Sequence, residues 1–173
     1  DGMAYGLSAE YPNDLVNTSV HWRDVQRNFQ PALGFVSRSN VRFVETRFEF
    51  SPRPKGFLNV RQMVHEVFYT HYTRLDTGQT ESWQLKTAPI NWHFSSGEEV
   101  EVGYIPQFEH LFAPRTLSRG VVLPAGDYRY TRARIRALAA SKRAFSGQVQ
   151  YQFSKLGGRH ELAPGIHVAP LGG

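Results

Sequence analysis

Hydrophobic and polar residues alternate with a period of two along most of this chain. The apolar positions that share one side of each run are Val16, Val20 and Trp22; Val44, Phe48 and Phe50; Trp83 and Leu85; Ile90, Trp92 and Phe94; Val100, Val102 and Tyr104; and Val149, Tyr151 and Phe153. This period is that of a β-strand with one apolar face and one polar face. The pattern therefore predicts an all-β protein.

Turn-like segments separate the runs. Residues 11–14, 51–56, 76–78, 95–97 and 124–127 are rich in Pro, Gly, Asn, Asp and Ser, the residues that favour turns. Turns this short connect antiparallel neighbours, because a parallel crossover needs a dozen or more residues. We predict an antiparallel meander of about eight strands.

Three stretches depart from the simple pattern. Residues 57–72 have mixed polar and apolar residues on both sides, which predicts a long strand that bulges or is covered twice. Residues 131–145 are rich in Ala and Arg, which favour helices, but Arg and apolar residues alternate strictly there, so we predict a strand. Residues 26–34 are predicted to hold a short helical turn.

We predict one domain over residues 1–156, followed by an extended tail, residues 157–173, that is rich in Gly and Pro. The tail is expected to wrap a partner or to fray. The chain opens Asp1-Gly2-Met3 without a visible leader, as a mature protein or a fragment of a longer one would.

Composition narrows the class of protein. The 173 residues are 40% hydrophobic and 13% aromatic, and none is cysteine. A disulfide scaffold, a thiolate metal site, an iron–sulfur cluster and a cysteine nucleophile are therefore excluded. No apolar run is long enough for a transmembrane helix. The net charge of +5 favours anionic partners, although a merely soluble basic surface would have the same charge.

Motifs of catalysis are missing from the sequence. Neither a Gly-rich phosphate loop nor a nucleophile elbow occurs, and the seven histidines lack the spacing of metal ligands. Glu98, Glu99 and Glu101 form an acidic cluster beside a Ser-Ser-Gly turn. Paired carboxylates can perform acid–base catalysis, but exposure to solvent is the simpler interpretation. We predict no catalytic residue, no cofactor and no metal ion.

Two residue sets are candidates for binding a partner. Arg132, Arg134 and Arg136 would project from one side of a strand at steps of roughly 7 Å, where they could meet lipid headgroups, phosphates or carboxylates. A polar, partly paired strand face is the alternative. Nucleic acid is not expected, because aromatic residues are scarce among these arginines. The second set, Trp22, Trp83 and Trp92, falls on apolar faces and fits either a sheet core or a membrane-interface belt.

The order of several motifs resembles a known family. The motifs are Tyr-Pro-Asn-Asp at 11–14, Trp-Arg-Asp at 22–24, Asn-Phe-Gln-Pro-Ala-Leu-Gly-Phe-Val-Ser-Arg at 28–38 and Ser-Pro-Arg-Pro at 51–54. They are similar to the C-terminal, β-barrel-like region of uncharacterised bacterial outer-membrane proteins. In that family a family-nine-type carbohydrate-binding module precedes this region. The module has no counterpart here, so carbohydrate binding does not carry over.

The resemblance implies an open or partly closed sheet derived from a barrel. The chain ends in Leu171-Gly172-Gly173 rather than in the aromatic residue typical of an outer-membrane barrel. In size and fragment character it also resembles a membrane-extrinsic subunit of a bacterial reaction centre–light-harvesting photosystem.

From this resemblance we expect a non-enzymatic structural subunit on the periplasmic side of a membrane. It would brace a larger membrane protein complex, with reaction-centre and antenna polypeptides as partners and anionic lipid headgroups as further contacts. Two alternatives stay open: a small outer-membrane β-barrel or barrel fragment, and a soluble β module that binds sugars or anions.

Overall fold

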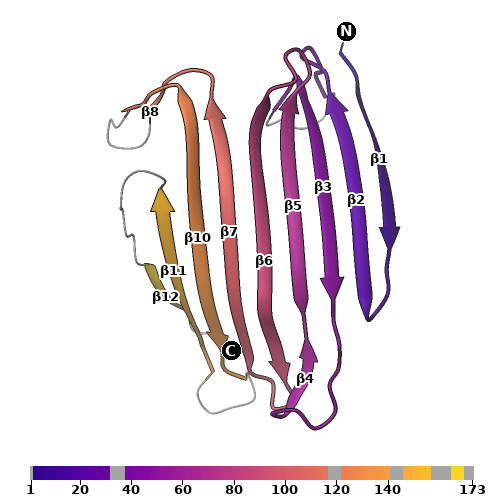
Figure 1. Cartoon of the computed structure of the whole chain (residues 1–173), viewed down its shortest axis with the longest axis vertical. Helices are drawn as coiled ribbons and strands as arrows, with labels where there is room; N and C mark the ends of the chain where they lie inside the picture. The colour runs from indigo at the N-terminus through magenta and orange to yellow at the C-terminus, as the bar shows by residue number, and fades with distance from the viewer. Residues whose placement is uncertain (1, 32–37, 117–121, 141–145, 157–164, 170–173) are drawn as a thin grey trace.

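A computed structural model of the chain describes residues 2–31, 38–116, 122–140, 146–156 and 165–169. These residues form one ten-stranded sheet and a separate two-stranded ribbon, with no helix among them (Figure 1). The strands are β1 (Ala4–Tyr11), β2 (Val16–Val25), β3 (Val41–Phe50), β4 (Val60–Met63), β5 (His65–Arg74), β6 (Thr80–Phe94), β7 (Glu99–Leu111), β8 (Arg115–Thr116), β9 (Val122–Leu123), β10 (Gly126–Leu138), β11 (Gln148–Leu156) and β12 (Gly165–Ala169).

The sheet is an open antiparallel meander, which confirms the predicted fold class. Its order is β1-β2-β3-β5-β6-β7-β10-β11-β12, with β4 added on β6, and it does not close. Short turns join the neighbours: Gly78 and Gly97 occupy the left-handed region in the β5–β6 and β6–β7 turns, with φ of 69° and 99°. The small β8–β9 ribbon lies between β7 and β10 in the chain.

The three stretches with an irregular pattern differ in how well the prediction agrees with the structure. One long strand over residues 57–72 is wrong: β4 and β5 are separate strands, and β4 pairs with β6. The strand predicted after residue 131 is confirmed as far as Leu138, and residues 141–145 lie outside the described part. In place of the predicted helical turn, the N–H of Phe29 closes a single turn on the carbonyl of Gln26 (3.1 Å); residues 32–34 are not described.

The expected tail contains a strand. β12 continues the sheet beyond β11, which ends at Leu156. The remainder of the tail, residues 157–164 and 170–173, lies outside the described residues.

The register gives the sheet two chemically different sides. Directly paired residues share a side, and successive residues alternate. One side, the apolar face, holds such rows as Leu7–Trp22–Val44–His71–Trp83–Phe108. The other, the polar face, holds such rows as Ser19–Arg47–Phe68–Lys86. Every apolar run identified in the sequence contributes to the same apolar face.

Few side chains of the described residues are buried. The buried apolar set is Val25, Val41, Val60, Ala88, Ile105 and Ala140. Val25, Val41, Ala88 and Ile105 lie on the polar face by register. The polar face also carries long charged side chains. The aliphatic stem of such a side chain can lie on the sheet and shield a small apolar neighbour, while its charged end reaches water. The apolar face has no second layer among the described residues.

Strand β6 is irregular on both of its edges. Its register shifts against β5 between Tyr72 and Thr73, and against β7 between Thr87 and Ile90. The second shift contains Pro89, which cannot donate a ladder hydrogen bond and is tolerated inside a sheet at a bulge. The ring of His65 lies 3.0 Å from the carbonyl of Pro89. The sheet therefore changes its local twist at β6.

A carboxylate joins the β2–β3 connection to the β5–β6 turn. Asp76 accepts hydrogen bonds from Arg74 Nε (3.0 Å), Arg74 Nη2 (2.8 Å) and Arg27 Nη2 (2.5 Å). The hydrogen bonds from Arg74 are the main reason that the pKa of Asp76 is held far below its ordinary value. The carboxylate therefore stays ionised in the folded chain at a pH where it is protonated in the unfolded chain.

We predict that Asp76→Asn makes unfolding less sensitive to acid. The contribution of a carboxylate with a lowered pKa is present above its unfolded-state pKa, about 4, and is lost as the pH falls toward its folded-state pKa. The difference in free energy of unfolding between the natural chain and the variant should be largest above pH 5 and shrink below pH 4. Urea unfolding between pH 2.5 and pH 7 measures it. A difference that stays constant over this range would contradict the assignment.

The location of the buried residues gives a second prediction. Val41 is 2% exposed, whereas Val149 on the apolar face is 55% exposed. Val41→Ala should lower the free energy of unfolding by about 1–2 kcal/mol, since it removes two buried carbons. Val149→Ala should lower it by less than about 0.5 kcal/mol. Urea denaturation of both variants tests this, and equal losses would show that the apolar face is covered within the chain.

Candidate docking surface

The apolar face is exposed over most of its extent. Among the side chains that the structure describes, every large apolar one of the ten-stranded sheet that is at least 38% exposed lies on this face by register. These residues are Tyr5, Leu7, Tyr11, Val20, Phe48, Phe50, Val67, Tyr104, Ile135, Val149 and Phe153. Soluble monomers rarely expose an apolar patch larger than a few hundred Å². A contiguous surface of this kind is typical of an interaction site.

The three predicted tryptophans lie on this face. Trp22 packs against Tyr5 (ring centroids 5.6 Å apart) and lies under the guanidinium of Arg42 (5.4 Å). Trp83 stacks on Phe108 at 6.5 Å, and Phe57 meets Trp92 edge-on at 5.8 Å. The indole N–H of Trp92 is buried without a hydrogen-bond partner. The tryptophans are spread over β2 and both ends of β6, so the structure does not gather them into one cluster.

Charge on the apolar face is confined to one end. Among the described side chains, Asp24 and Arg42 pair in one row, Asp127 shares a row with His110, and Arg129 follows one row further on. Asp24 accepts two hydrogen bonds from Arg42, at 2.9 and 2.8 Å.

The rows beyond the middle of the sheet carry no Asp, Glu, Lys or Arg among the described side chains of the face. They contain Tyr11, Phe48, Val67, Tyr104 and Phe153, followed by Phe50, Val102, Ile135 and Tyr151. Closer to the charged end, burial lowers the pKa of His71, whose imidazole lies 3.1 Å from the hydroxyl of Thr80. The face therefore has a charged end and an uncharged, aromatic remainder.

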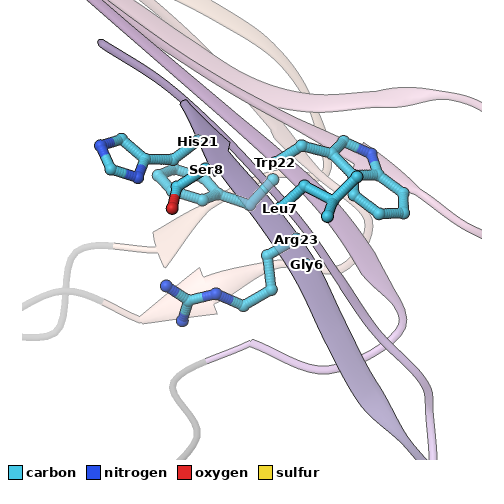
Figure 2. Close-up of a pocket in the computed structure, with 7 residues that line it drawn as sticks. Gly6, Leu7, Ser8, His21, Trp22 and Arg23 are labelled. Atoms are coloured by element: carbon cyan, nitrogen blue, oxygen red, sulfur yellow. The ribbon is translucent and has the colours of Figure 1, made fainter. Parts of the chain in front are cut away.

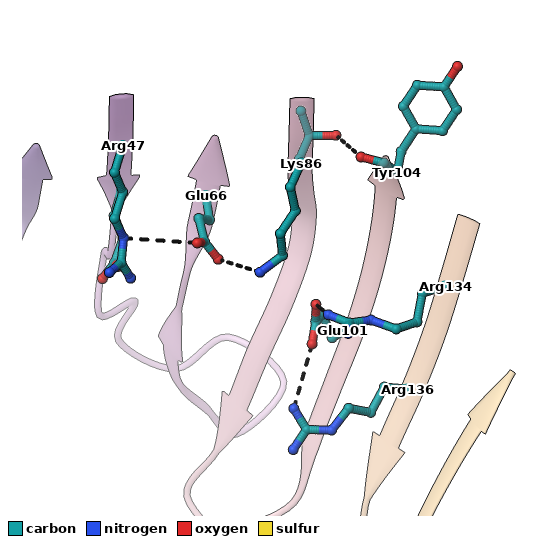
Figure 3. A network of polar contacts seen from close by, with 9 residues as sticks. Arg47, Glu66, Lys86, Glu101, Tyr104, Arg134 and Arg136 are labelled. Atoms are coloured by element: carbon teal, nitrogen blue, oxygen red, sulfur yellow. Dashed lines mark hydrogen bonds and ion pairs between the residues drawn. The ribbon is translucent and has the colours of Figure 1, made fainter. Parts of the chain in front are cut away.

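The polar face neutralises most of its own charge (Figure 3). Glu66 lies between Lys86 (3.2 Å) and Arg47 (3.9 Å), and Arg47 also contacts Glu49 (2.9 Å). Glu101 contacts Arg134 and lies 3.6 Å from Arg136. Except for the Arg47–Glu49 pair within β3, these ion pairs join neighbouring strands. A surface whose charges are paired in this way is suited to contact with water.

The structure places the predicted arginine row on the polar face, opposite the tryptophans. Arg134 and Arg136 are paired with glutamates of β7, and Arg136 also donates to the Gln148 side-chain oxygen (3.0 Å). Arg132 has a neutral partner: the Gln107 amide accepts from Arg132 Nε (2.9 Å) and donates to the Tyr130 hydroxyl (2.8 Å) in the orientation that satisfies both. All three arginines therefore have partners within the sheet, and for two of them the partner is a carboxylate.

Described residues of the sheet line two shallow hollows that bear on the site. The first, of about 210 Å³, is lined by residues of β1–β3, where His21 and Arg23 point away from Trp22 (Figure 2). The second, of about 150 Å³, lies on the polar face between Tyr72 and Tyr130. Burial and, to a smaller extent, Glu109 raise the pKa of Tyr130. Both hollows are lined by hydrogen-bonding groups, so they could accept small polar molecules.

The acidic cluster is not the solvent-exposed set that we expected. Glu101 is 6% exposed and contacts Arg134 and Arg136, and Glu99 lies 3.3 Å from His93. The cause is the register of β7 and β10, which places the glutamates beside the arginine row. In the described part of the chain, no three His, Asp or Glu side chains are grouped closely enough to hold a metal ion. Among the same residues, no helix is long and apolar enough to cross a membrane.

Comparison with known proteins identifies no relative. No protein-family model, no curated protein and no solved structure matches the chain.

The sequence pattern does not assign several residues of the apolar face to it. Val67 and Tyr69 belong to the stretch with mixed faces, and β1, with Leu7, was not recognised as a strand. The alternation within β5 would identify the first two once the break after Met63 is placed. In β1, alternation is present in Tyr5, Leu7, Ala9 and Tyr11 but is weakened by Ala and Gly.

We predict that Glu101→Ala lowers the free energy of unfolding by about 1–3 kcal/mol, because it leaves the partly buried guanidinium of Arg134 without its carboxylate and Arg136 with Glu99 alone. Glu101→Gln keeps the volume and one acceptor and should cost less. In a double-mutant cycle, Glu101→Ala with Arg134→Ala should cost less than the sum of the single changes. Additive losses in urea unfolding would show that the contact does not contribute to stability.

Proposed function

We propose that this protein is a non-enzymatic structural subunit that docks through its apolar face and braces a larger membrane protein complex. The observation that carries the proposal is the concentration of exposed large apolar side chains of the sheet on one face. Each Å² of apolar surface that a partner removes from water contributes about 25 cal/mol to the free energy of association. A partner that covers the face would supply the second layer that a one-layer sheet lacks.

The difference between the two faces supports a position at the surface of a complex, with one face on the partner and the other in water, rather than a position buried inside it. The ion pairs of the polar face, such as Lys86–Glu66 and Arg136–Glu99, are compatible with water. The apolar face carries its charges at one end only. We propose that the uncharged remainder contacts apolar surfaces of membrane-protein subunits, while the charged end stays in water or meets anionic lipid headgroups.

The resemblance in size and fragment character to a photosystem subunit suggests a class of partner. We propose that the complex lies at the periplasmic side of a bacterial membrane and that its other subunits are polypeptides of the reaction-centre and antenna type. Isolation of a tagged chain from gently solubilised native membranes tests this. The expected result is a stable assembly containing membrane-spanning polypeptides, released by high salt or stronger detergent. Recovery as a free monomer without partners would overturn the proposal.

A paired substitution tests the apolar face itself. Phe48 and Val67 lie directly opposite each other in β3 and β5 and are 47% and 42% exposed. Phe48→Glu combined with Val67→Lys preserves cross-strand pairing through opposite charges. We expect recovery with the membrane complex to fall at least roughly tenfold, because burying the new charges costs more than about 1.4 kcal/mol.

Thr70→Lys is the matched control. Thr70 lies on the polar face of β5, directly opposite Glu45 of β3, so the variant adds a lysine to the same strand on the other side. It should remain with the complex, and circular dichroism should show the same strand signal for all three proteins. If the paired variant and the control are recovered equally well, the apolar face is not the docking surface.

A further inference from the structure

Strand β1 forms an edge of the sheet, and no described strand pairs with its outer side. It pairs with β2 over its whole length and is the first strand in the sheet order. All eight of its residues are exposed. Natural sheets usually protect such edges with Lys, Pro, a bulge or a covering segment. β1 contains neither Lys nor Pro, and its register against β2 is unbroken.

The hydrogen bonds next to β1 identify which backbone groups are free. Gln26 N–H donates to the carbonyl of Met3 (3.0 Å), so positions 3 and 26 form a bonded pair. Bonded and non-bonded pairs alternate in an antiparallel ladder, so Tyr5, Leu7, Ala9 and Tyr11 bond to β2. On the far side of β2, Ser51 N–H donates to Leu15 (2.8 Å), which fits the same alternation.

The residues that remain direct their N–H and C=O groups outward from the sheet. These are Ala4, Gly6, Ser8 and Glu10. Three of the four side chains are small, so they leave room for another strand to approach. Leu7, which lies between them on the apolar face, is the most exposed large apolar residue of the sheet, at 76%.

We propose that β1 pairs with β1 of a second copy of this chain, antiparallel, with Leu7 opposite Leu7 on the two-fold axis. In this register Ala4 exchanges hydrogen bonds with Glu10 of the other copy, and Gly6 with Ser8. All four outward-facing residues of each copy are then paired. The inference does not depend on the proposed function.

The side chains of β1 favour a second copy of the chain as the partner, and they favour this register. Paired residues must share a face, and the two-fold axis through Leu7 keeps the apolar faces of both copies on the same side. Tyr5 then lies opposite Ala9, a large residue beside a small one. Glu10, the only charged residue of β1, lies opposite Ala4 rather than a second carboxylate. Moving the axis to Ser8 would place Ala4 opposite Pro12, which has no N–H.

Because the chain contains no cysteine, disulfide cross-linking can test the register. In the proposed dimer, Leu7 of one copy lies opposite Leu7 of the other in a non-hydrogen-bonded pair. The Cα atoms of such a pair are roughly 4.5 Å apart, which is within the range of a disulfide. Leu7→Cys should form a covalent dimer under mild oxidation. Val20→Cys, an exposed position on the apolar face of β2, is the control and should not. Equal cross-linking of both variants, or none of Leu7→Cys, would overturn the proposal.

A second pair of variants tests the backbone pairing without cysteine. Ser8→Pro removes an outward-facing N–H and no bond to β2, so the protein should sediment as a monomer at concentrations where the natural chain is a dimer. Ser8→Ala keeps the N–H and should remain dimeric. Circular dichroism checks that both variants fold. A natural chain that is monomeric throughout, or a Ser8→Pro variant that dimerises equally well, would show that this edge does not join two copies.

Discussion

Cross-strand register is the constraint on which this structure depends. In a single-layer sheet each strand has two faces, and a shift by one residue would move every side chain to the other face. Here four consecutive pairings, from β2 to β7, keep Trp22, Val44, Trp83 and Phe108 together. The same pairings align Glu101 with Arg136 on the opposite side. The apolar face and the ion-pair network are therefore two results of one set of backbone hydrogen bonds.

The buried side chains lie where a two-layer fold would not place them. Val41, Ala88 and Ile105 are buried on the polar face, while Phe48 and Val67 on the apolar face are almost half exposed. Charged side chains are long enough to cover small apolar neighbours, whereas valine and phenylalanine cannot cover each other in one layer. Among the described residues, the polar face is thus covered by its own side chains, whereas the apolar face is left open.

Much of the fold could be predicted from the sequence because alternation is a local property. Val16, Val20 and Trp22 mark one side of β2 without knowledge of its neighbours, and the structure agrees. Alternation failed where a strand was interrupted: the break at Val64 separates β4 from β5, and no turn residue marks it. The ion pairs of Arg134 and Arg136 also could not be predicted, since they depend on which strand lies beside β10.

The irregular register of β6 affects the shape of the apolar face that the proposed partner would cover. The strand shifts against both neighbours, with Pro89 at one of the shifts. A bulge bends the strand that contains it and increases local twist, so the apolar surface does not continue as one flat plane across β6. A rigid planar partner would cover the strands on one side of β6 and leave those on the other side in contact with water. To cover the whole apolar face, one partner must follow this change of direction, or two separate partners must lie side by side.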